Sequence, residues 1–188
     1  MGNTVLLLLD IQNGIVDLVG SPASYVELVG PTAAAARQHS IKVIHVVTAF
    51  RPGYPENNPL SSSTPAVAAS GNFLEGSDSV QVHPAAARTS EEPIIIKRRV
   101  SAFHATELDL ILRSSGTDHI VVAGLITSGA VLSTVRQASD MDYRVTVLRD
   151  LCMDRDDEVH RVLMDKVFAR KADVISAKEW VDSLASSA

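Results

Sequence analysis

The sequence predicts an α/β protein with a Rossmann-like, three-layer α/β/α architecture around a six-stranded parallel sheet. Apolar segments of strand length alternate with helical patterns along the chain, and this alternation is typical of a parallel sheet with right-handed crossovers. Several of the apolar segments are continuous, as expected of strands that are buried on both faces. Hydrophobic residues make up 46% of the 188 residues, which favours one domain over residues 1–188.

Six segments are predicted to be strands. The first is an apolar run, residues 4–9, that leads directly into Asp10. The second, residues 41–48, is rich in the β-branched side chains that favour strands. The remaining strands are predicted at residues 93–97, 119–124, 144–148 and 172–175.

Five helices are predicted, at residues 25–39, 106–115, 128–141, 158–168 and 177–184. Gly30 and Pro31 interrupt the first of these helices. Pro31 is expected in the first turn of the part that follows the interruption. Thr106 is predicted to be the N-cap of the second helix, with Asp109 three residues later as a capping-box acid. Gly116 is expected to end that helix.

A long irregular segment, residues 50–92, holds most of the prolines and many serines. A loop of this length inside a compact domain is usually functional, as a lid or binding loop, and a floppy insertion is the alternative. Tyr54 and Phe73 are candidates to cover a pocket, with packing as their other role. Trp180, in the last predicted helix, is expected to pack internally or at an oligomer contact.

Composition excludes several functional classes. The net charge is −5 and the basic residues cluster only at 97–99, so nucleic-acid binding is not expected. A single cysteine, Cys152, leaves no disulfide framework and no cysteine-based zinc site. We find no charged leader and no apolar run long enough for a membrane span. A cytoplasmic protein without a membrane partner is therefore expected.

No cofactor and no metal is predicted. The six histidines are scattered, and the segment after residue 50 holds no Asp-x-His motif. No Gly-x-Gly-x-x-Gly motif follows a strand, which argues against a dinucleotide cofactor. The expected partners are a small-molecule substrate and further copies of the chain.

Two predicted strands end in charged residues, Asp10 and Lys97. Ligands of open α/β sheets bind at the carboxyl ends of the strands, so both residues are candidates for chemistry. A carboxylate that loses water there becomes a useful acid or base unless a cation holds it ionised. The structural alternatives are a turn-capping aspartate and a surface lysine.

The turn after the fourth strand, residues 125–131, is rich in small residues. Small side chains let a substrate approach the main chain. The start of the following helix offers N–H groups suited to a carboxylate or an oxyanion.

Three motifs, in this order, resemble the isochorismatase-like hydrolase family, which is also called the cysteine hydrolase superfamily. They are LLDIQN at residues 8–13, KRRVSAF at residues 97–103 and VAGLIT at residues 122–127. Further matches are Thr106, Leu108, Val131, Thr134, residues 142–145 and Asp150. The resemblance covers nearly the whole chain and implies a sheet ordered 3-2-1-4-5-6 and a homodimer or homotetramer.

The resemblance implies a catalytic set of Asp, Lys and Cys. Asp10 and Lys97 match the first two, but Ala130 stands at the position of the cysteine. Alanine has no nucleophilic atom, so a thioester route at this position is closed. The isochorismatases of phenazine biosynthesis are similar in lacking the cysteine. They protonate a vinyl ether, and Asp10 would be that acid with Lys97 as its partner.

The predicted substrate-binding residues are Gln12, Phe50, Arg51, Ile126, Thr127, Ser128 and Gly129. Isochorismatases without the cysteine carry a glutamine after the second strand, whereas this chain has Phe50, so isochorismate itself is in question. Arg51 could clamp a carboxylate in bidentate fashion or remain a solvated loop residue.

Three hypotheses remain open. The first is a hydrolase of a small carboxylated molecule, with Asp10 as acid or base, Lys97 as its partner and no covalent step. The second is an amidase or C–N hydrolase whose nucleophilic cysteine is replaced by Ala130. The third is a binding protein that kept the fold and lost turnover, because fold does not fix function.

Overall fold

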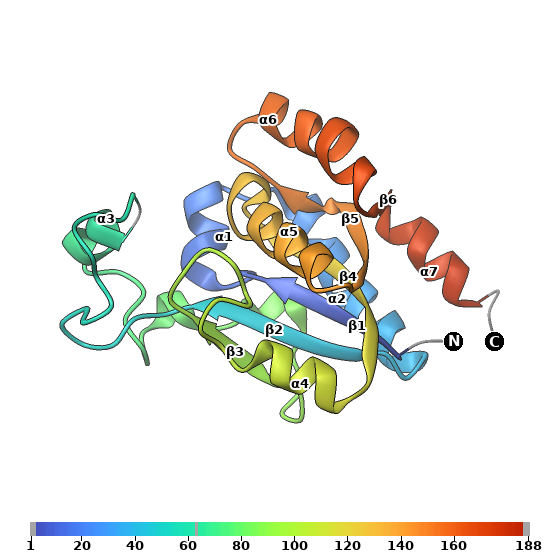
Figure 1. Ribbon diagram of the computed structural model, residues 1–188, viewed down its shortest axis with the longest axis horizontal. Helices are drawn as coiled ribbons and strands as arrows, with labels where there is room; N and C mark the ends of the chain where they lie inside the picture. The colour runs from blue at the N-terminus through green and yellow to red at the C-terminus, as the bar shows by residue number, and fades with distance from the viewer. Residues whose placement is uncertain (1–2, 63, 186–188) are drawn as a thin grey trace.

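A computed structural model of the protein describes residues 3–62 and 64–185, which fold around a central parallel sheet (Figure 1). The six strands lie in the order β3-β2-β1-β4-β5-β6, and all neighbouring pairs are parallel. The predicted fold class and strand order are therefore confirmed. The strands are β1 (Asn3–Leu9), β2 (Lys42–Thr48), β3 (Ile94–Lys97), β4 (Thr117–Leu125), β5 (Arg144–Met153) and β6 (Asp173–Ile175).

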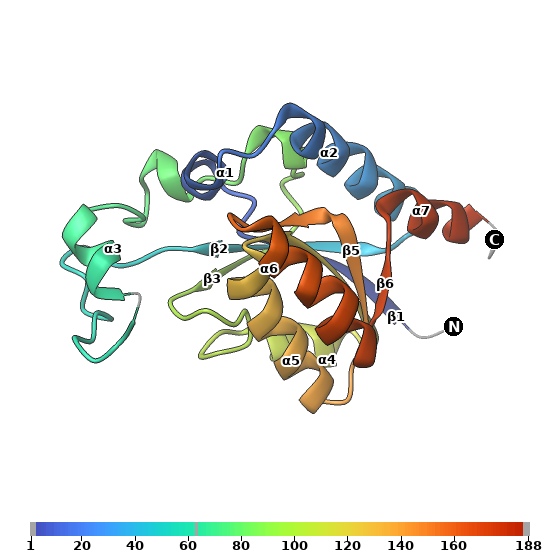
Figure 2. The same cartoon turned by 90° about the horizontal axis from the view of Figure 1, so that it is seen from above.

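Helices cover both faces of the sheet (Figure 2). One face carries α1 (Asn13–Val19), α2 (Ala23–Gln38) and α7 (Ala177–Ala185). The other carries α4 (Leu108–Ser114), α5 (Leu132–Asp140) and α6 (Asp157–Val162). None of these described helices is long and apolar enough to cross a membrane.

Strand β1 shows why its sequence is apolar without alternation. Leu6 and Leu8 pack with the core cluster under α2 and α7, whereas Leu7 and Leu9 pack with the cluster under α4 and α5. All four are at most 1% exposed. Successive side chains of a strand point to opposite faces, so a strand with a helix layer on each side needs apolar residues at every position.

Two predicted helix starts are wrong. Helix α2 begins at Ala23 and Pro31 lies in its interior, not in its first turn. Helix α4 begins at Leu108 with Glu107 at the N-cap position, not at Thr106. The Thr106 hydroxyl donates to the Ala102 carbonyl at 2.5 Å and accepts from the Leu108 amide at 3.3 Å, so it closes the preceding turn.

The acid predicted for that capping box has other partners. Asp109 accepts hydrogen bonds from the Tyr143 hydroxyl at 2.9 Å and from Arg113 at 3.2 Å. The predicted end of the helix is confirmed, because the Gly116 amide bonds the Arg113 carbonyl at 3.0 Å and Gly116 has a φ of +64°. A glycine adopts that conformation without steric cost.

Helix α1 was not predicted from the sequence. It is short, and Gly14 near its start weakens a helical pattern. The glycine is explained by packing, because a Cβ atom there would lie 2.8 Å from the Ser79 Cβ and 2.9 Å from the Phe73 ring. The long loop thus packs directly against α1.

Parts of the long segment, residues 50–92, pack against the body of the protein. Ala49, Phe50, Phe73 and Val80 form a small buried cluster, so Phe73 packs in a core and is not a pocket cover. Helix α3 (Thr64–Ser70) stands out from the body of the protein, as both ribbon views show (Figures 1 and 2). Trp180 is buried in the core beneath α7.

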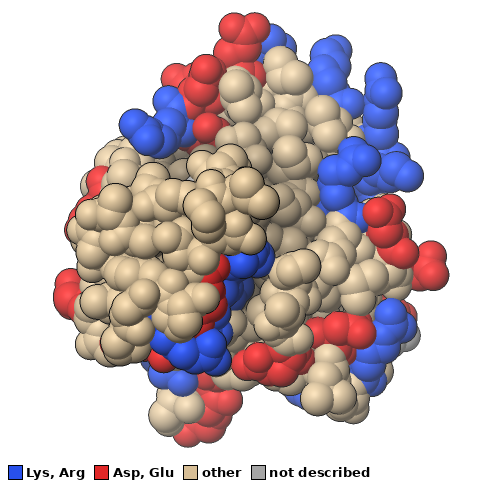
Figure 3. All heavy atoms as spheres, turned by 60° about the vertical axis from the view of Figure 1, so that its left-hand side comes forward, with Lys and Arg blue, Asp and Glu red and all other residues tan. Residues whose placement is uncertain are grey.

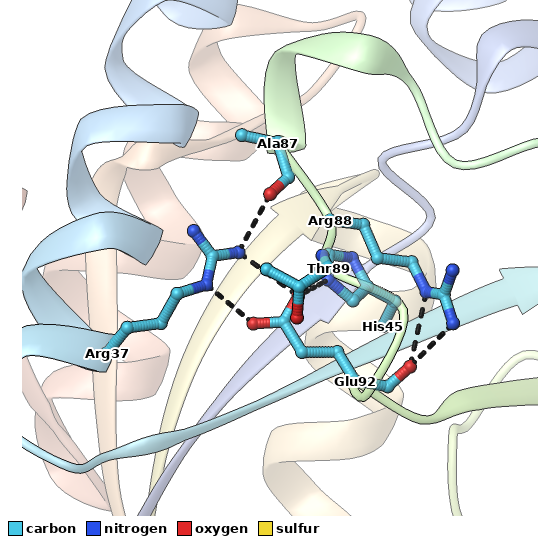
Figure 4. A network of polar contacts seen from close by, with 6 residues as sticks. All are labelled: Arg37, His45, Ala87, Arg88, Thr89 and Glu92. Carbon is cyan, nitrogen blue, oxygen red and sulfur yellow. Dashed lines mark hydrogen bonds and ion pairs between the residues drawn. The ribbon is translucent and has the colours of Figure 1, made fainter.

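A polar network fastens the end of this segment to β2 and α2 (Figure 4). The buried Glu92 carboxylate accepts from Arg37 at 2.7 and 3.1 Å, from the Thr89 amide at 3.1 Å and from His45 at 3.0 Å. Burial acts to raise the pKa of Glu92, but the hydrogen bonds from Arg37, His45 and Thr89 outweigh it and lower that pKa to about 2. The network holds the chain where it enters β3, the strand that ends at Lys97.

Replacing Glu92 with glutamine is expected to lower the free energy of unfolding by about 2–3 kcal/mol, because charge-assisted hydrogen bonds to Arg37 and His45 are lost. For a chain of this size, that corresponds to a fall in Tm of about 5–10 °C. The adjacent, exposed Glu91 is the control, and Glu91→Gln should leave Tm unchanged. Scanning calorimetry at pH 7 makes this comparison.

The same variant gives a pH test. The folded-state pKa of Glu92 lies below its usual value of 4.5, so its stabilisation is complete above pH 4.5 and is lost as the pH falls toward 2. The Tm difference between Glu92→Gln and the unmodified protein should shrink across this range. A difference that stays constant down to pH 2 would contradict the assigned ionisation.

Candidate active site

Three neighbouring strands bring polar side chains to one edge of the sheet. Asp10 follows β1, Thr48 ends β2 and Lys97 ends β3, and these strands are adjacent in the sheet. The strands are parallel, so their carboxyl ends lie on the same side. This is the edge where open α/β sheets bind ligands.

The three side chains form a closed triangle of short contacts. Lys97 Nζ lies 2.8 Å from Asp10 Oδ2 and donates to Thr48 Oγ1 at 2.7 Å. The Thr48 hydroxyl donates to Asp10 Oδ1 at 3.0 Å. Asp10 is 4% exposed and Lys97 is 3% exposed, so the ion pair lies almost entirely out of bulk water.

This geometry favours the ionised carboxylate. Both oxygens of Asp10 accept, one from an ammonium group and one from a hydroxyl, which is the pattern of a carboxylate without a proton. Asp10 also has a φ of +53°, an uncommon backbone conformation that often marks functional sites. The structure therefore holds the Asp10 carboxylate in a fixed orientation, with a partner at each oxygen.

The turn after β4 lies beside this triangle. Ile126, Gly129 and Ala130 line the same pocket as Asp10 and Lys97. The peptide bond between Leu125 and Ile126 is cis, and the amides of Gly129 and Val131 both bond the Ile126 carbonyl, at 3.0 and 3.3 Å. Ala130, which the sequence resemblance places at the position of the cysteine, is 4% exposed and offers only a methyl group.

The pocket is small and mainly apolar. Its volume is about 170 Å³, below the ~300–1,000 Å³ that is usual for drug-sized ligands. Besides the triangle and Ala130, it is lined by Ile15, Phe50, Thr64, Val67, Arg98, Arg99, Val100, Leu125, Ile126 and Gly129. A view onto this side of the molecule shows basic and acidic side chains gathered in a hollow (Figure 3).

Of the predicted substrate-binding residues, Phe50, Ile126 and Gly129 line the pocket. Gln12 is fully buried, and its amide bonds main-chain groups of Thr48 and Ser79 at 2.7–3.0 Å. Its observed role is thus to fix the end of β2.

The other three predicted binding residues do not line the pocket. The Arg51 side chain pairs with Glu56 at 2.6 Å and is 58% exposed. The Thr127 hydroxyl lies 2.9 Å from His160 Nδ1, and the Ser128 amide donates to Asp154 at 2.6 Å. The last two contacts anchor the turn from its far side.

Cys152 is not placed to replace the missing nucleophile. It lies in β5, is paired in register with Gly124 and does not line the pocket. Burial raises the pKa of its thiol to about 12, so the reactive thiolate is scarce at neutral pH.

Sequence reasoning missed Thr48, Arg98 and Arg99. Thr48 carries the same signal that identified Asp10 and Lys97, because it is the last residue of a strand in the same part of the sheet. Arg98 and Arg99 directly follow Lys97 but look like ordinary charged loop residues. Among residues 3–62 and 64–185, no group of three or more His, Cys, Asp or Glu side chains could hold a metal ion.

A family model described as the isochorismatase domain matches residues 4–179. The chain belongs to the isochorismatase family. This isochorismatase-family protein is 32% identical to the isochorismatase family protein YecD of Escherichia coli O157:H7, over 96% of each chain. It is 25% identical to a maleamate amidohydrolase of Pseudomonas putida, over 95% of this chain and 85% of the relative.

Two further likenesses frame the family. A "probable inactive nicotinamidase" of Arabidopsis thaliana is 31% identical to this isochorismatase-family protein over 97% of each chain. The crystal structure of a cysteine hydrolase from Pseudomonas syringae superposes with a TM-score of 0.91, at 23% identity, over 99% of this chain and 94% of the other. That last likeness shows the shared fold alone.

Proposed function

We propose that the protein hydrolyses a small carboxylated molecule by acid–base chemistry without a covalent enzyme intermediate. The observation that carries this proposal is the dry triangle of Asp10, Thr48 and Lys97 beside the methyl group of Ala130. Removing two charges from water costs free energy, so a buried ion pair adds little to stability. Its position in a pocket therefore favours a functional role.

The methyl group of Ala130 beside Asp10 supports the non-covalent route. In an amidase of the cysteine type, a neighbouring carboxylate takes the proton of the thiol, and the thiolate so formed attacks the carbonyl carbon. Here Ala130 lines the pocket and offers no atom for that attack. Asp10 can instead take a proton from water, or pass one to the substrate after gaining it.

Lys97 and Thr48 orient the reacting carboxylate of Asp10. Their contacts to the two oxygens of Asp10 fix the plane of the carboxylate, so less reorganisation is needed during reaction. Displacing either contact as substrate enters would free one oxygen of Asp10 to contact a proton of water or of the substrate. The pair can therefore serve an acid step, as in vinyl-ether cleavage, or a base step that activates water.

The family supplies two candidate bonds. Isochorismate is the substrate of the isochorismatases of phenazine biosynthesis, which this chain resembles in lacking the cysteine, and maleamate is the substrate named for one relative. Both molecules are small and carry a carboxylate, although one reacts at an ether and the other at an amide. The small size of the pocket fits this class.

The second candidate is an amidase or C–N hydrolase whose cysteine is replaced by Ala130, supported by the amidohydrolase relative. The third is a protein without turnover, supported by the relative described as an inactive nicotinamidase. Replacing Ala130 with cysteine separates these hypotheses. Cys152→Ala provides the background, so that any thiol effect belongs to position 130.

Pyruvate release from isochorismate and ammonia release from maleamate are the readouts. The proposal expects turnover by the Cys152→Ala protein that resists alkylating reagents and does not increase when Ala130→Cys is added. The amidase hypothesis expects ammonia only from the Ala130→Cys protein, and its loss on alkylation. No product from either protein with either substrate would favour the inactive hypothesis and remove these two substrates.

A further inference from the structure

Three arginines lie at or beside the pocket, and they differ in whether a carboxylate pairs with the guanidinium group. Arg98 Nε lies 2.8 Å from a Glu56 oxygen, and Arg98 also pairs with Glu75. Arg51 pairs with the same Glu56. These two guanidinium groups therefore already face carboxylates.

Arg99 differs from both. Its guanidinium donates to two main-chain carbonyls, that of Arg98 at 2.6 Å and that of Glu56 at 3.2 Å. No carboxylate among the described residues lies within ion-pair distance of it. Arg99 is half-buried and lines the pocket, so within the described part of the chain it presents a positive charge there without a carboxylate partner.

The charge of the pocket follows from these pairs. Lys97 is matched by Asp10. The two arginines Arg51 and Arg98 are together matched by two glutamates. Arg99 thus leaves the pocket with one positive charge in excess. A guanidinium group has five N–H donors, and the two carbonyl contacts leave donors for an incoming carboxylate.

We propose that Arg99 binds a carboxylate of the substrate and that the pocket prefers a carboxylate to a neutral group at that place. This inference rests on the proposed function and names the group that positions the substrate. Arg99 and Asp10 line one pocket of about 170 Å³, so a molecule held at Arg99 by its carboxylate reaches the triangle with its other end.

Two probes of nearly equal shape test the charge preference. Succinamate carries one carboxylate, and succinamide carries a neutral amide in its place. Titrations followed by NMR should show that the unmodified protein binds succinamate at least about 10-fold more tightly, as expected for one charge-assisted contact. Equal binding of the two probes, or no binding of succinamate at about 10 mM, would overturn the inference.

Substitutions assign the preference to one residue. Arg99→Gln should remove the preference for succinamate, and Arg99→Lys should keep part of it because a charge remains. Arg136→Gln is the matched control, since Arg136 is exposed on α5 and its loss changes the net charge equally. An unchanged preference in Arg99→Gln, with an unchanged Tm, would contradict the assignment.

The binding assay also separates this inference from the proposed function. A preference that depends on Arg99, without product from any carboxylated substrate, would keep the binding site and overturn the proposed hydrolysis. Turnover with a KM that is the same in Arg99→Gln would keep hydrolysis and overturn this inference. If both hold, Arg99→Gln should raise KM with little change in kcat, as expected of a contact present in ground and transition states.

Discussion

Asp10→Asn is expected to lower turnover of the identified substrate by about 10²–10⁴-fold, the usual contribution of a general acid or base. Asparagine has nearly the same shape but cannot take or deliver a proton at neutral pH. Lys97 and Thr48 remain close to position 10, so the loss reports chemistry more than shape. Steady-state assays with Asp17→Asn, which removes an exposed carboxylate from α1, provide the control.

The same substitution also affects folding, and the two effects need to be separated. The neutral amide at position 10 would leave the buried Lys97 ammonium without its counter-charge, and breaking a buried pair in this way costs about 3–5 kcal/mol. In the double variant, Lys97→Met is added to Asp10→Asn. Methionine has a similar volume to lysine and removes the unpaired positive charge. The double variant is therefore expected to unfold at a higher temperature than Asp10→Asn alone, and to be equally inactive.

Two outcomes would contradict this account. Turnover by Asp10→Asn within about threefold of the unmodified protein would remove Asp10 from the proposed acid–base step. A double variant that is destabilised by the sum of the two single effects would show that Asp10 and Lys97 are not energetically coupled. A stable but inactive double variant would establish both roles of the pair.

The rule that polar residues at strand ends meet in parallel sheets explains what the sequence could predict. It singled out Asp10 and Lys97 because each closes an apolar strand, and the strand order brings the two ends close with β2 between them. The same rule applies to Thr48. It was passed over because a threonine that ends a β-branched strand looks like part of the strand.

Other site features depend on contacts that the sequence does not record. Gln12 belongs to the first motif, but its amide is hydrogen-bonded to main-chain groups 36 and 67 residues away in the sequence and does not line the pocket. The excess charge of Arg99 becomes visible only when the partners of Arg98 are known. The type of a residue predicts which groups its side chain can bind. Contacts with the long loop determine which of these side chains are already paired and which can still bind a ligand.

Replacing Gly124 with alanine is expected to have the second large effect, because it should lower both the stability of the fold and the activity of the site. It lies in β4 with a φ of +143°, a conformation that side chains strongly disfavour. A Cβ atom there would lie 2.1 Å from the Leu9 carbonyl oxygen and 2.7 Å from the Leu9 amide nitrogen. These are main-chain atoms of β1, so they cannot rotate away.

Gly124→Ala is therefore expected to cost more than about 4 kcal/mol, the range of the most severe single substitutions, and to lower Tm by about 10 °C or more. Gly71→Ala is the control, because Gly71 also has a positive φ, +70°, but no described atom lies within 4 Å of the place that its Cβ would occupy. That change should cost only about 1–2 kcal/mol. Equal Tm values for the two variants would contradict the close approach of β4 to Leu9.

The position of Gly124 makes this effect relevant to chemistry. Leu9 directly precedes Asp10, and Gly124 directly precedes Leu125 and the turn that carries Ala130. Because Gly124 has no side chain, β4 can approach β1 closely at this point. The close approach brings Asp10 and the turn that carries Ala130 to the same pocket. Any folded Gly124→Ala protein should therefore lose turnover and also bind succinamate more weakly, since separating β1 from β4 widens the pocket. Arg99→Gln, by contrast, should weaken binding while Tm is kept, so the pair of measurements distinguishes a deformed pocket from a lost contact.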